Sequence, residues 1–394
     1  MSKNKLLTRR HTLLLGLGMA ATIGCSANKV NGQSEQLLTS NDLNDFQDYL
    51  KRSFTVSGKG SLKKRAAAKG LIYGAESAYN HLSTDEDFAA GIRRECNMLM
   101  HGGLKWYMPP KPLRPTADTF DFTAGDWMAN FAQKHNLLFR GHTLVWHENL
   151  PPWFDEIVNE QNAEEFMIKH IQTVVKHFAG RMHSWDVVNE AIDPDSGRND
   201  SLRNTPWLKF LGLDYIELAF RTAAQADPKA MLVYNDYGFE YDNQDAKRAA
   251  ALKLLERLKS RDVPVHAFGL QAHLAGNVKI HVTKLRSFLK DIADLGLKIM
   301  ITEMDVGDAE LPKDISTRDR IVAGVYEDFL SVVLDEPAVI AITTFGLSDR
   351  YTWLTHNHPR KDGLPLRPLP LDDQMKRKLA WNAIARAFDK APQR

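Results

Sequence analysis

Two glutamates, Glu190 and Glu303, stand at the ends of apolar runs, where a buried strand is expected to end. Glu190 closes the run SWDVVNE, and Glu303 lies in KIMITEMDV. Burying an ionised carboxylate without a partner costs on the order of several kcal/mol, so such a residue is either exposed at a rim or held there for chemistry. A protonated and an ionised carboxyl group together can cleave a glycosidic bond, because one protonates the leaving oxygen and the other attacks the sugar carbon or activates water.

Polar and aromatic side chains follow the other apolar runs as well. They are Lys105, His142, Trp146, Asn189, Asn235, Tyr237, Gln271, His273, Asp305, Phe345 and Trp353. For a single glutamate, an ion pair at the protein rim is the simpler explanation. Two glutamates in the company of amide, imidazole and indole groups favour a catalytic site instead.

The elements that must position these side chains are eight short apolar runs. They cover residues 71–77, 97–106, 137–146, 182–190, 231–237, 267–274, 298–306 and 339–349. Between them, apolar residues recur with helical spacing, most clearly in residues 163–180, 215–227, 245–262 and 283–296.

Parallel strands that are covered on both faces give such near-continuous apolar runs, so the pattern predicts a (β/α)8 TIM barrel that forms a single catalytic domain. An open doubly wound sheet is the alternative, but it usually has fewer strands, and no glycine-rich phosphate loop follows the first run. In a barrel the active site lies at the carboxyl ends of the strands. Glu190 and Glu303 would then end the fourth and seventh strands and face one another across the barrel mouth.

The chain is expected to have three parts. Residues 1–25 predict an export signal, because they begin with basic residues, continue with an apolar stretch and end in small residues. Arg9-Arg10 resembles a twin-arginine signal, and Thr22 to Cys25 resembles a bacterial lipoprotein cleavage site with Cys25 as the lipidated residue. Residues 26–60 are polar and predict a tether, and residues 61–390 predict the catalytic barrel. We therefore expect an exported protein that is periplasmic, secreted or anchored to a membrane by a lipid.

The charge of the mature chain excludes some partners. The formal net charge is +2, but Lys3, Lys5, Arg9 and Arg10 lie in the expected signal without any acid, which leaves −2 for the rest. A near-neutral mature chain lacks the excess of basic residues that is typical of a nucleic-acid-binding protein. No second apolar span of membrane length follows, so a lipid at Cys25 is the only membrane attachment that we expect. We expect a monomer.

Five motifs carry a resemblance to a known family. They are GHTLVWH, WDVVNE, YNDY, GLQAHL and ITEMD, in this order along the chain. They resemble the glycoside hydrolase family 10 endo-1,4-β-xylanases over about residues 60–388. The resemblance implies a retaining double-displacement mechanism in which Glu190 is the general acid/base and Glu303 the nucleophile. It also implies a polysaccharide or oligosaccharide substrate, xylan or a related β-glycan, with no metal and no other cofactor.

The same resemblance implies roles for the neighbours of the two glutamates. Asn189 should donate to the 2-hydroxyl of the sugar at the cleavage point, and His273, held by Asp305, should keep Glu303 ionised and oriented. Tyr237 and Trp353 offer flat faces on which a pyranose ring can stack. Four further residues resemble the sugar-binding residues on the glycone side: Lys105, His142, Trp146 and Gln271.

Two positions depart from the family pattern. The second strand usually ends in Pro-Glu-Asn-x-Met/Leu-Lys-Trp, but here MHGGLKW places His101 and Gly102 where Glu and Asn would stand. Those two residues normally bind the second sugar on the glycone side. We therefore expect lost hydrogen bonds and open space that could admit a substituent or a differently shaped sugar. The expected result is weak activity on linear xylan, with a preference for a decorated xylan or a non-xylan β-glycan. At the eighth strand, Phe345 replaces the Trp of the usual Val-Trp-Gly, so a smaller ring lines the cleavage subsite.

Two other classes of protein stay open. A metal-dependent hydrolase on the same barrel could use His142, His147, His273 and Asp305, but such enzymes usually need paired histidines at strand ends, and the first apolar run has none. A carbohydrate-binding or sensing barrel that has lost catalysis would be expected to lack one of the two glutamates, and both are present.

Overall fold

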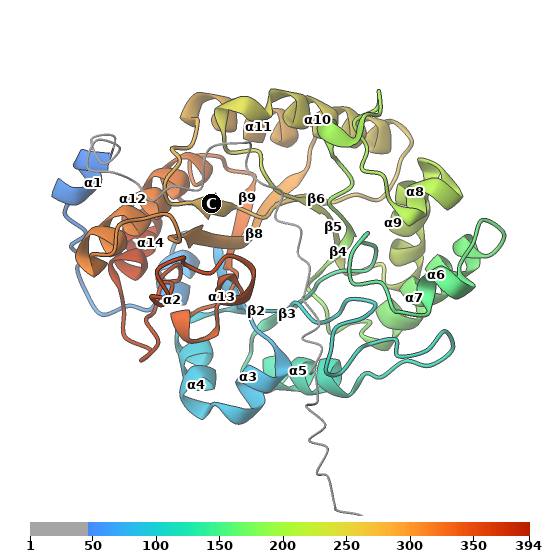
Figure 1. Ribbon diagram of the computed structural model, residues 1–394, viewed down its shortest axis with the longest axis horizontal. Helices are drawn as coiled ribbons and strands as arrows, with labels where there is room; N and C mark the ends of the chain where they lie inside the picture. The colour runs from blue at the N-terminus through green and yellow to red at the C-terminus, as the bar shows by residue number, and fades with distance from the viewer. Residues whose placement is uncertain (1–45) are drawn as a thin grey trace, which may run out of the picture.

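The computed structural model describes residues 46–394 (Figure 1). The expected export signal, Cys25 and the first part of the expected tether lie outside the described residues.

Eight parallel strands form a closed barrel. They are β1 (Ile72–Glu76), β2 (Met98–His101), β3 (Leu138–Gly141), β4 (Ser184–Asn189), β5 (Met231–Asp236), β6 (Ala267–Leu270), β8 (Lys298–Gly307) and β9 (Val339–Thr344). Each pairs with its neighbour in this order, and β9 pairs with β1 to close the ring. A short further strand, β7 (His273–Ala275), pairs only with the outer end of β8. The predicted (β/α)8 barrel is thus confirmed.

Helices surround the strands on the outside (Figure 1). They are α1 (Gln47–Lys51), α2 (Leu62–Ala67), α3 (Tyr79–Thr84), α4 (Glu86–Glu95), α5 (Thr123–Lys134), α6 (Phe154–Ile157), α7 (Ala163–His177), α8 (Pro206–Leu211), α9 (Asp214–Ala226), α10 (Asp245–Ser260), α11 (Val282–Asp294), α12 (Ile315–Val333), α13 (Leu354–Asn357) and α14 (Leu379–Lys390), with 3-10 turns η2 (Pro194–Ser196), η3 (Asp242–Gln244) and η4 (Asp349–Tyr351). The long helices are amphipathic, as their sequences predict. In α7, for example, Met167, Ile171 and Val174 are buried at steps of four and three residues.

The strands are covered on both faces, which explains their continuous apolar sequences. All six residues of β4 are buried, including polar Ser184 and Asp186. A small apolar cluster is separate from the main core and draws one residue from each of five strands: Met98, Val233, Ala267, Met300 and Ala341. We interpret this cluster as the filling of the barrel, because side chains from different strands meet inside a closed sheet.

The second half of the expected tether, residues 46–60, belongs to the packed body, which corrects the sequence interpretation for this stretch. Tyr49 of α1 is 3% exposed, and its hydroxyl donates to Asp328 of α12 at 2.7 Å. Its ring lies directly over Gly324, where a Cβ atom would come within 2.3 Å of the ring. The sequence did not reveal this contact, because Phe46, Tyr49 and Phe54 are isolated apolar residues in a polar stretch.

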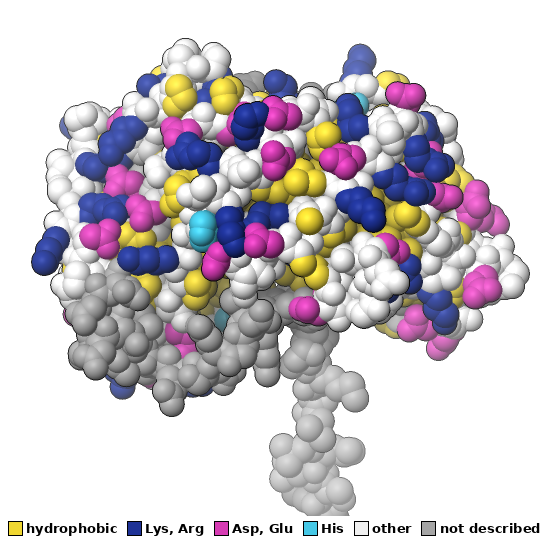
Figure 2. Space-filling model, turned by 90° about the horizontal axis from the view of Figure 1, so that it is seen from above, with side chains coloured by type: hydrophobic (Ala, Val, Ile, Leu, Met, Phe, Trp, Pro, Cys, Tyr) yellow, Lys and Arg dark blue, Asp and Glu magenta, His cyan; other side chains and the backbone are white. Residues whose placement is uncertain are grey.

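The surface of the described part mixes charges of both signs. In the face shown in Figure 2, Lys and Arg side chains are interspersed with Asp and Glu. No helix within residues 46–394 has both the length and the apolar character needed to cross a membrane.

Candidate active site

Glu303 lies in β8 at the mouth of the barrel. It is 3% exposed, and three side chains hold its carboxylate. Oε1 accepts a hydrogen bond of 2.7 Å from Asn235 and lies 3.7 Å from Nδ1 of His142. Oε2 lies 3.3 Å from Nε2 of His273. Contacts to both oxygens fix the orientation of the carboxylate.

These neighbours keep Glu303 ionised. Burial by itself would raise the pKa of Glu303, but the charge of His142 and the hydrogen bonds from His273 and Asn235 lower the pKa to about 2. The carboxylate therefore carries its negative charge throughout the neutral pH range, which is the state that a nucleophile requires.

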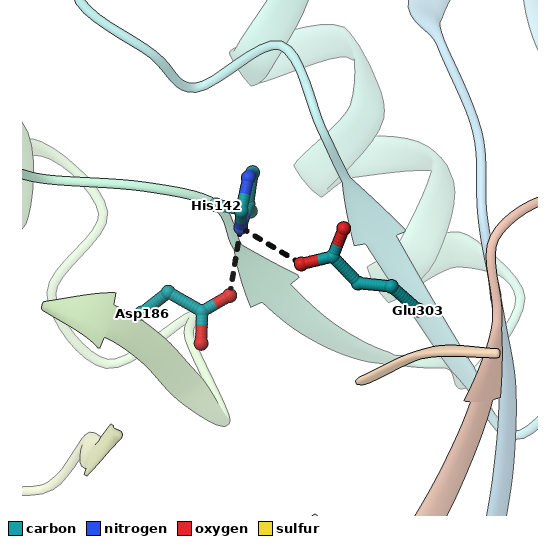
Figure 3. A group of neighbouring side chains, drawn as sticks. All are labelled: His142, Asp186 and Glu303. Carbon is teal, nitrogen blue, oxygen red and sulfur yellow. Dashed lines mark hydrogen bonds and ion pairs between the residues drawn. The ribbon is translucent and has the colours of Figure 1, made fainter. Parts of the chain in front are cut away.

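His142 is itself held by a buried ion pair beneath the site. Figure 3 shows its ring between Asp186 and Glu303, with Nδ1 directed toward both carboxylates. Nδ1 lies 2.9 Å from Oδ2 of Asp186, and the guanidinium of Arg140 binds Oδ1 of the same residue. Arg140 and Asp186 are fully buried. The arrangement positions His142 from the β3 and β4 side of the barrel.

Glu190 follows β4 directly and has a left-handed backbone, with φ of 57°. A non-glycine residue in this region is uncommon and often marks a functional position. Its Oε1 accepts hydrogen bonds from Gln271 at 2.9 Å and Asn189 at 3.1 Å, and its Oε2 accepts one from Trp146 at 3.0 Å. Burial raises the pKa of Glu190, and the donors from Gln271 and Trp146 oppose this only in part.

A chain of amides connects the two carboxylates. Asn235 donates to Glu303 and, at 2.9 Å, to Oδ1 of Asn189, whose own amide nitrogen donates to Glu190. The Asn235 amide can point only one way, because the ionised Glu303 only accepts hydrogen bonds and must face the amide nitrogen, which leaves Oδ1 to accept from Thr302 at 2.7 Å. Environments that push two carboxyl pKa values apart identify an acid and a base. Here the neighbours depress the pKa of Glu303 while burial elevates that of Glu190.

Gln271 and His273 reach the two carboxylates from one bend in the chain. The single residue between them, Ala272, has φ of 63°. In a regular strand, residues two apart would point the same way. The left-handed residue instead separates them, so Gln271 donates to Glu190 and His273 contacts Glu303.

His273 is oriented by Asp305, as predicted. Its Nδ1 lies 3.0 Å from Oδ1 of Asp305, whose Oδ2 accepts a hydrogen bond of 2.7 Å from Trp353. Although burial would lower the pKa of His273, the charges and hydrogen bonds of Asp305 and Glu303 raise it to about 10. The ring is therefore protonated and presents a positive charge to Glu303.

The remaining predicted residues surround this network. The Lys105 ammonium lies 4.7 Å from the centre of the Trp146 ring. Phe345 packs edge to face against His273 and Trp353, with ring centres 5.3 and 6.0 Å away. Every predicted site residue except Cys25 thus lies in the described structure, and these residues meet at the barrel mouth.

Tyr237 is less available for stacking than the sequence suggested. The Lys247 ammonium lies 3.6 Å from its ring centre and covers one face, and its hydroxyl accepts a hydrogen bond of 2.9 Å from Arg203. The Arg203 guanidinium also lies 5.9 Å from the centre of this ring, so two cations compete with a sugar for the aromatic surface of Tyr237.

The open space expected at His101 and Gly102 does not exist, so that expectation is wrong. His101 is 4% exposed, and burial lowers its pKa to about 4, which leaves the ring neutral. The volume above Gly102 is occupied by Glu76 of β1, since a Cβ atom on Gly102 would lie 2.9 Å from Oε1 of Glu76. Glu76 could not be identified from the sequence, because nothing in the first apolar run connects it to a residue in the second.

Three further buried residues support the site although the sequence predicted no role for them: Arg140, Asp186 and Asn235. Asp186 and Asn235 lie inside the motifs WDVVNE and YNDY, so the motifs themselves were the signal that could have identified them. Arg140 had no such signal. That Arg140 binds Asp186 becomes clear only from the pairing of β3 with β4.

The four residues considered for a metal site do not form one group. Among residues 46–394, the set with converging ligand atoms is His142, Asp186 and Glu303, within 4.8 Å of one another. The guanidinium of Arg140 already neutralises Asp186, and a second cation beside it would be repelled. Hydrogen bonding and ion pairing explain this cluster without a metal.

Comparison with known proteins agrees with this geometry. The family model described as "Glycosyl hydrolase family 10" matches residues 61–387. The chain is 34% identical to endo-1,4-beta-xylanase B of Thermotoga neapolitana over 72% of this chain and 79% of that protein. It is 36% identical to endo-1,4-beta-xylanase A of Caldicellulosiruptor sp. (strain Rt8B.4) over 64% of this chain, but spans only 38% of that longer protein.

Solved structures show the same architecture. Xylanase 10B from Thermotoga petrophila RKU-1, determined in complex with xylobiose, superposes with a TM-score of 0.76 at 32% identity, covering 85% of this chain and 99% of that one. Native xylanase 10B from Thermotoga maritima gives a TM-score of 0.76 at 34% identity, covering 84% and 98%. The extent of the sequence match, together with the paired carboxylates at the ends of β4 and in β8, shows that this chain belongs to glycosyl hydrolase family 10.

Proposed function

We propose that the chain is a retaining endo-β-1,4-glycosidase that hydrolyses xylan or a related β-glycan by double displacement. The observation that carries this proposal is that two buried carboxyl groups at one barrel mouth have pKa values shifted in opposite directions. The neighbours of Glu303 lower its pKa to about 2, whereas burial raises the pKa of Glu190. Several similar proteins are named endo-1,4-beta-xylanases, which supports xylan as the substrate.

In the first step, an oxygen of Glu303 attacks the anomeric carbon while the bond from that carbon to the leaving oxygen breaks. Glu190 gives its proton to the leaving oxygen. In the second step, water attacks the anomeric carbon, the now ionised Glu190 takes a proton from that water, and the ester bond to Glu303 breaks. Each displacement inverts the anomeric carbon, so the product keeps the configuration of the substrate.

The neighbouring groups support both steps. The amide of Asn189 stands between the two carboxylates and can donate to the 2-hydroxyl of the sugar being cleaved. The protonated His273 balances the charge of Glu303 until the covalent bond forms. Trp146, Phe345 and Trp353 supply aromatic surface, and Lys105 supplies a further hydrogen-bond donor. Because one chain supplies the entire site, we propose that the enzyme acts as a monomer.

The activity is tested with a panel of linear xylan, decorated xylans, mixed-linkage β-glucan and short xylo-oligosaccharides, with products separated by length. We expect a xylan to yield a series of oligosaccharides with the β-anomer formed first, as seen by NMR. Release of single sugars alone would overturn the internal mode of cleavage. Absence of cleavage of every β-1,4-glycan would overturn the proposed function.

We further propose that the protein is exported through the twin-arginine route and then remains in the periplasm or on a membrane surface through a lipid on Cys25. Arg9-Arg10, the apolar run after it, and the residues Thr22 to Cys25 support this proposal.

Replacing Arg9 and Arg10 by lysine should leave the precursor in the cytoplasm. Cys25→Ala should prevent lipid attachment, which fractionation into soluble and membrane protein would detect. Unchanged export of the lysine variant contradicts the route, and normal processing of a soluble Cys25→Ala protein identical to wild type contradicts the lipid.

A further inference from the structure

Glu76 is the last residue of β1 and is level with the start of the loop that follows β2. In the register of these two strands, Glu76 is opposite Met100, so its side chain is close to His101 and Gly102. Active-site residues of a barrel occupy this end of the strands. Glu76 takes no part in either displacement step.

The side chain of Glu76 lies over Gly102. A Cβ atom at Gly102 would be 2.9 Å from Oε1 of Glu76 and 3.4 Å from its Cδ and Cγ. A separation below 3.0 Å requires something to move, so Glu76 in this position and a side chain at residue 102 exclude one another. Glycine at position 102 therefore leaves the room that the side chain of Glu76, on the neighbouring strand, occupies.

The surroundings of Glu76 belong to the substrate groove. Its carboxyl group interacts with the charges of Lys105 and Glu303, and the backbone N–H of Gly102 donates to it. Burial, opposed by the attraction of Lys105, raises its pKa to about 7. The residue as a whole is only partly buried.

We propose that Glu76 is a substrate-binding residue that accepts a hydrogen bond from a hydroxyl of the second sugar on the glycone side. It takes this role from β1, in the place where His101 and Gly102 provide neither a carboxylate nor an amide side chain after β2. The proposal rests on the proposed glycosidase function. In its ionised form the carboxyl group of Glu76 is negative, so the position favours an unsubstituted sugar and disfavours one that carries a carboxylate there, because like charges repel.

Two aryl glycosides distinguish this role from a structural one. An aryl β-xyloside fills only the sugar site at the cleaved bond, whereas an aryl β-xylobioside also fills the second glycone site. Glu76→Ala should lower kcat/KM on the xylobioside by about tenfold or more, the size expected for a hydrogen bond to a charged group, and change the xyloside by no more than about twofold. Glu76→Gln keeps an acceptor and should lie between wild type and Glu76→Ala. Glu256, an exposed residue of α10, is the matched control, because Glu256→Ala removes the same carboxylate far from the groove.

A second pair of variants tests the relation between the two strands. Gly102→Asn alone should impair the xylobioside as Glu76→Ala does, because the new side chain displaces Glu76. Glu76→Ala combined with Gly102→Asn should recover at least part of the loss, since an amide oxygen now occupies the vacated space. Thermal melting of each variant checks that the fold is intact.

The outcomes separate this inference from the function on which it rests. If wild type cleaves both glycosides and Glu76→Ala leaves kcat/KM on each of them unchanged, the role of Glu76 is overturned while the glycosidase function stands. An equal loss on both substrates would also overturn it, because the effect would then fall on the cleavage site rather than on the second sugar. If wild type cleaves no β-glycoside, the proposed function itself fails.

Discussion

Glu303→Ala is expected to lower kcat on every β-glycan by more than about 10⁴-fold, the scale on which loss of a nucleophile acts. Without the carboxylate, no group remains in the position held by Asn235, His142 and His273 that could attack the anomeric carbon. Steady-state rates on an aryl xylobioside measure the loss. Glu256→Ala, which removes a carboxylate from the outer surface, serves as the control and should keep wild-type rates.

Added azide identifies the role of the missing group. In Glu303→Ala the anion can enter the vacated space and attack from the nucleophile's side, so the product should be a glycosyl azide of inverted configuration. NMR of the isolated azide establishes the anomer. A product of retained configuration, or wild-type turnover without azide, would show that Glu303 is not the nucleophile.

Glu190→Ala is expected to lower kcat/KM on xylan by about 10²- to 10⁴-fold, the contribution of a positioned general acid. Xylan has a poor leaving group that needs the proton. An aryl glycoside with an acidic phenol does not, so on that substrate the first step should be nearly unaffected. Comparing phenols of different acidity measures this dependence. Equal losses on good and poor leaving groups would contradict the role of Glu190 as acid.

The pH profile offers an independent check on Glu190. Only the protonated acid can donate, so kcat/KM of wild type should fall as the pH rises through the pKa of Glu190. Burial places that pKa above the ordinary glutamate value, which extends activity toward neutral pH. In Glu190→Ala, the alkaline limb should disappear when the substrate has a good leaving group.

The barrel could be predicted from the sequence because strands buried on both faces leave a clear apolar signal. The boundaries of β2 and β3 could not, since the runs 97–106 and 137–146 continue beyond His101 and Gly141, where these strands end. The extra apolar residues, such as Leu104 and Leu144, are buried in the loops at the barrel mouth. Burial without strand pairing looks the same in a sequence as burial within a strand.

The candidate site could be predicted where a motif placed several functional residues close together in sequence. Asn189 with Glu190, and Glu303 with Asp305, are examples. Glu76 could not be found in this way, because its role depends on Gly102, which directly follows the neighbouring strand. For the same reason, the departure at His101 and Gly102 suggested an empty space when another part of the chain had filled it.

The bend at Ala272 links one donor on Glu190 to one on Glu303. Because Gln271 and His273 leave the same left-handed residue in different directions, a small rotation of that backbone would move a donor on each carboxylate at once. A substitution that shifted the bend would therefore change the acid and the nucleophile together.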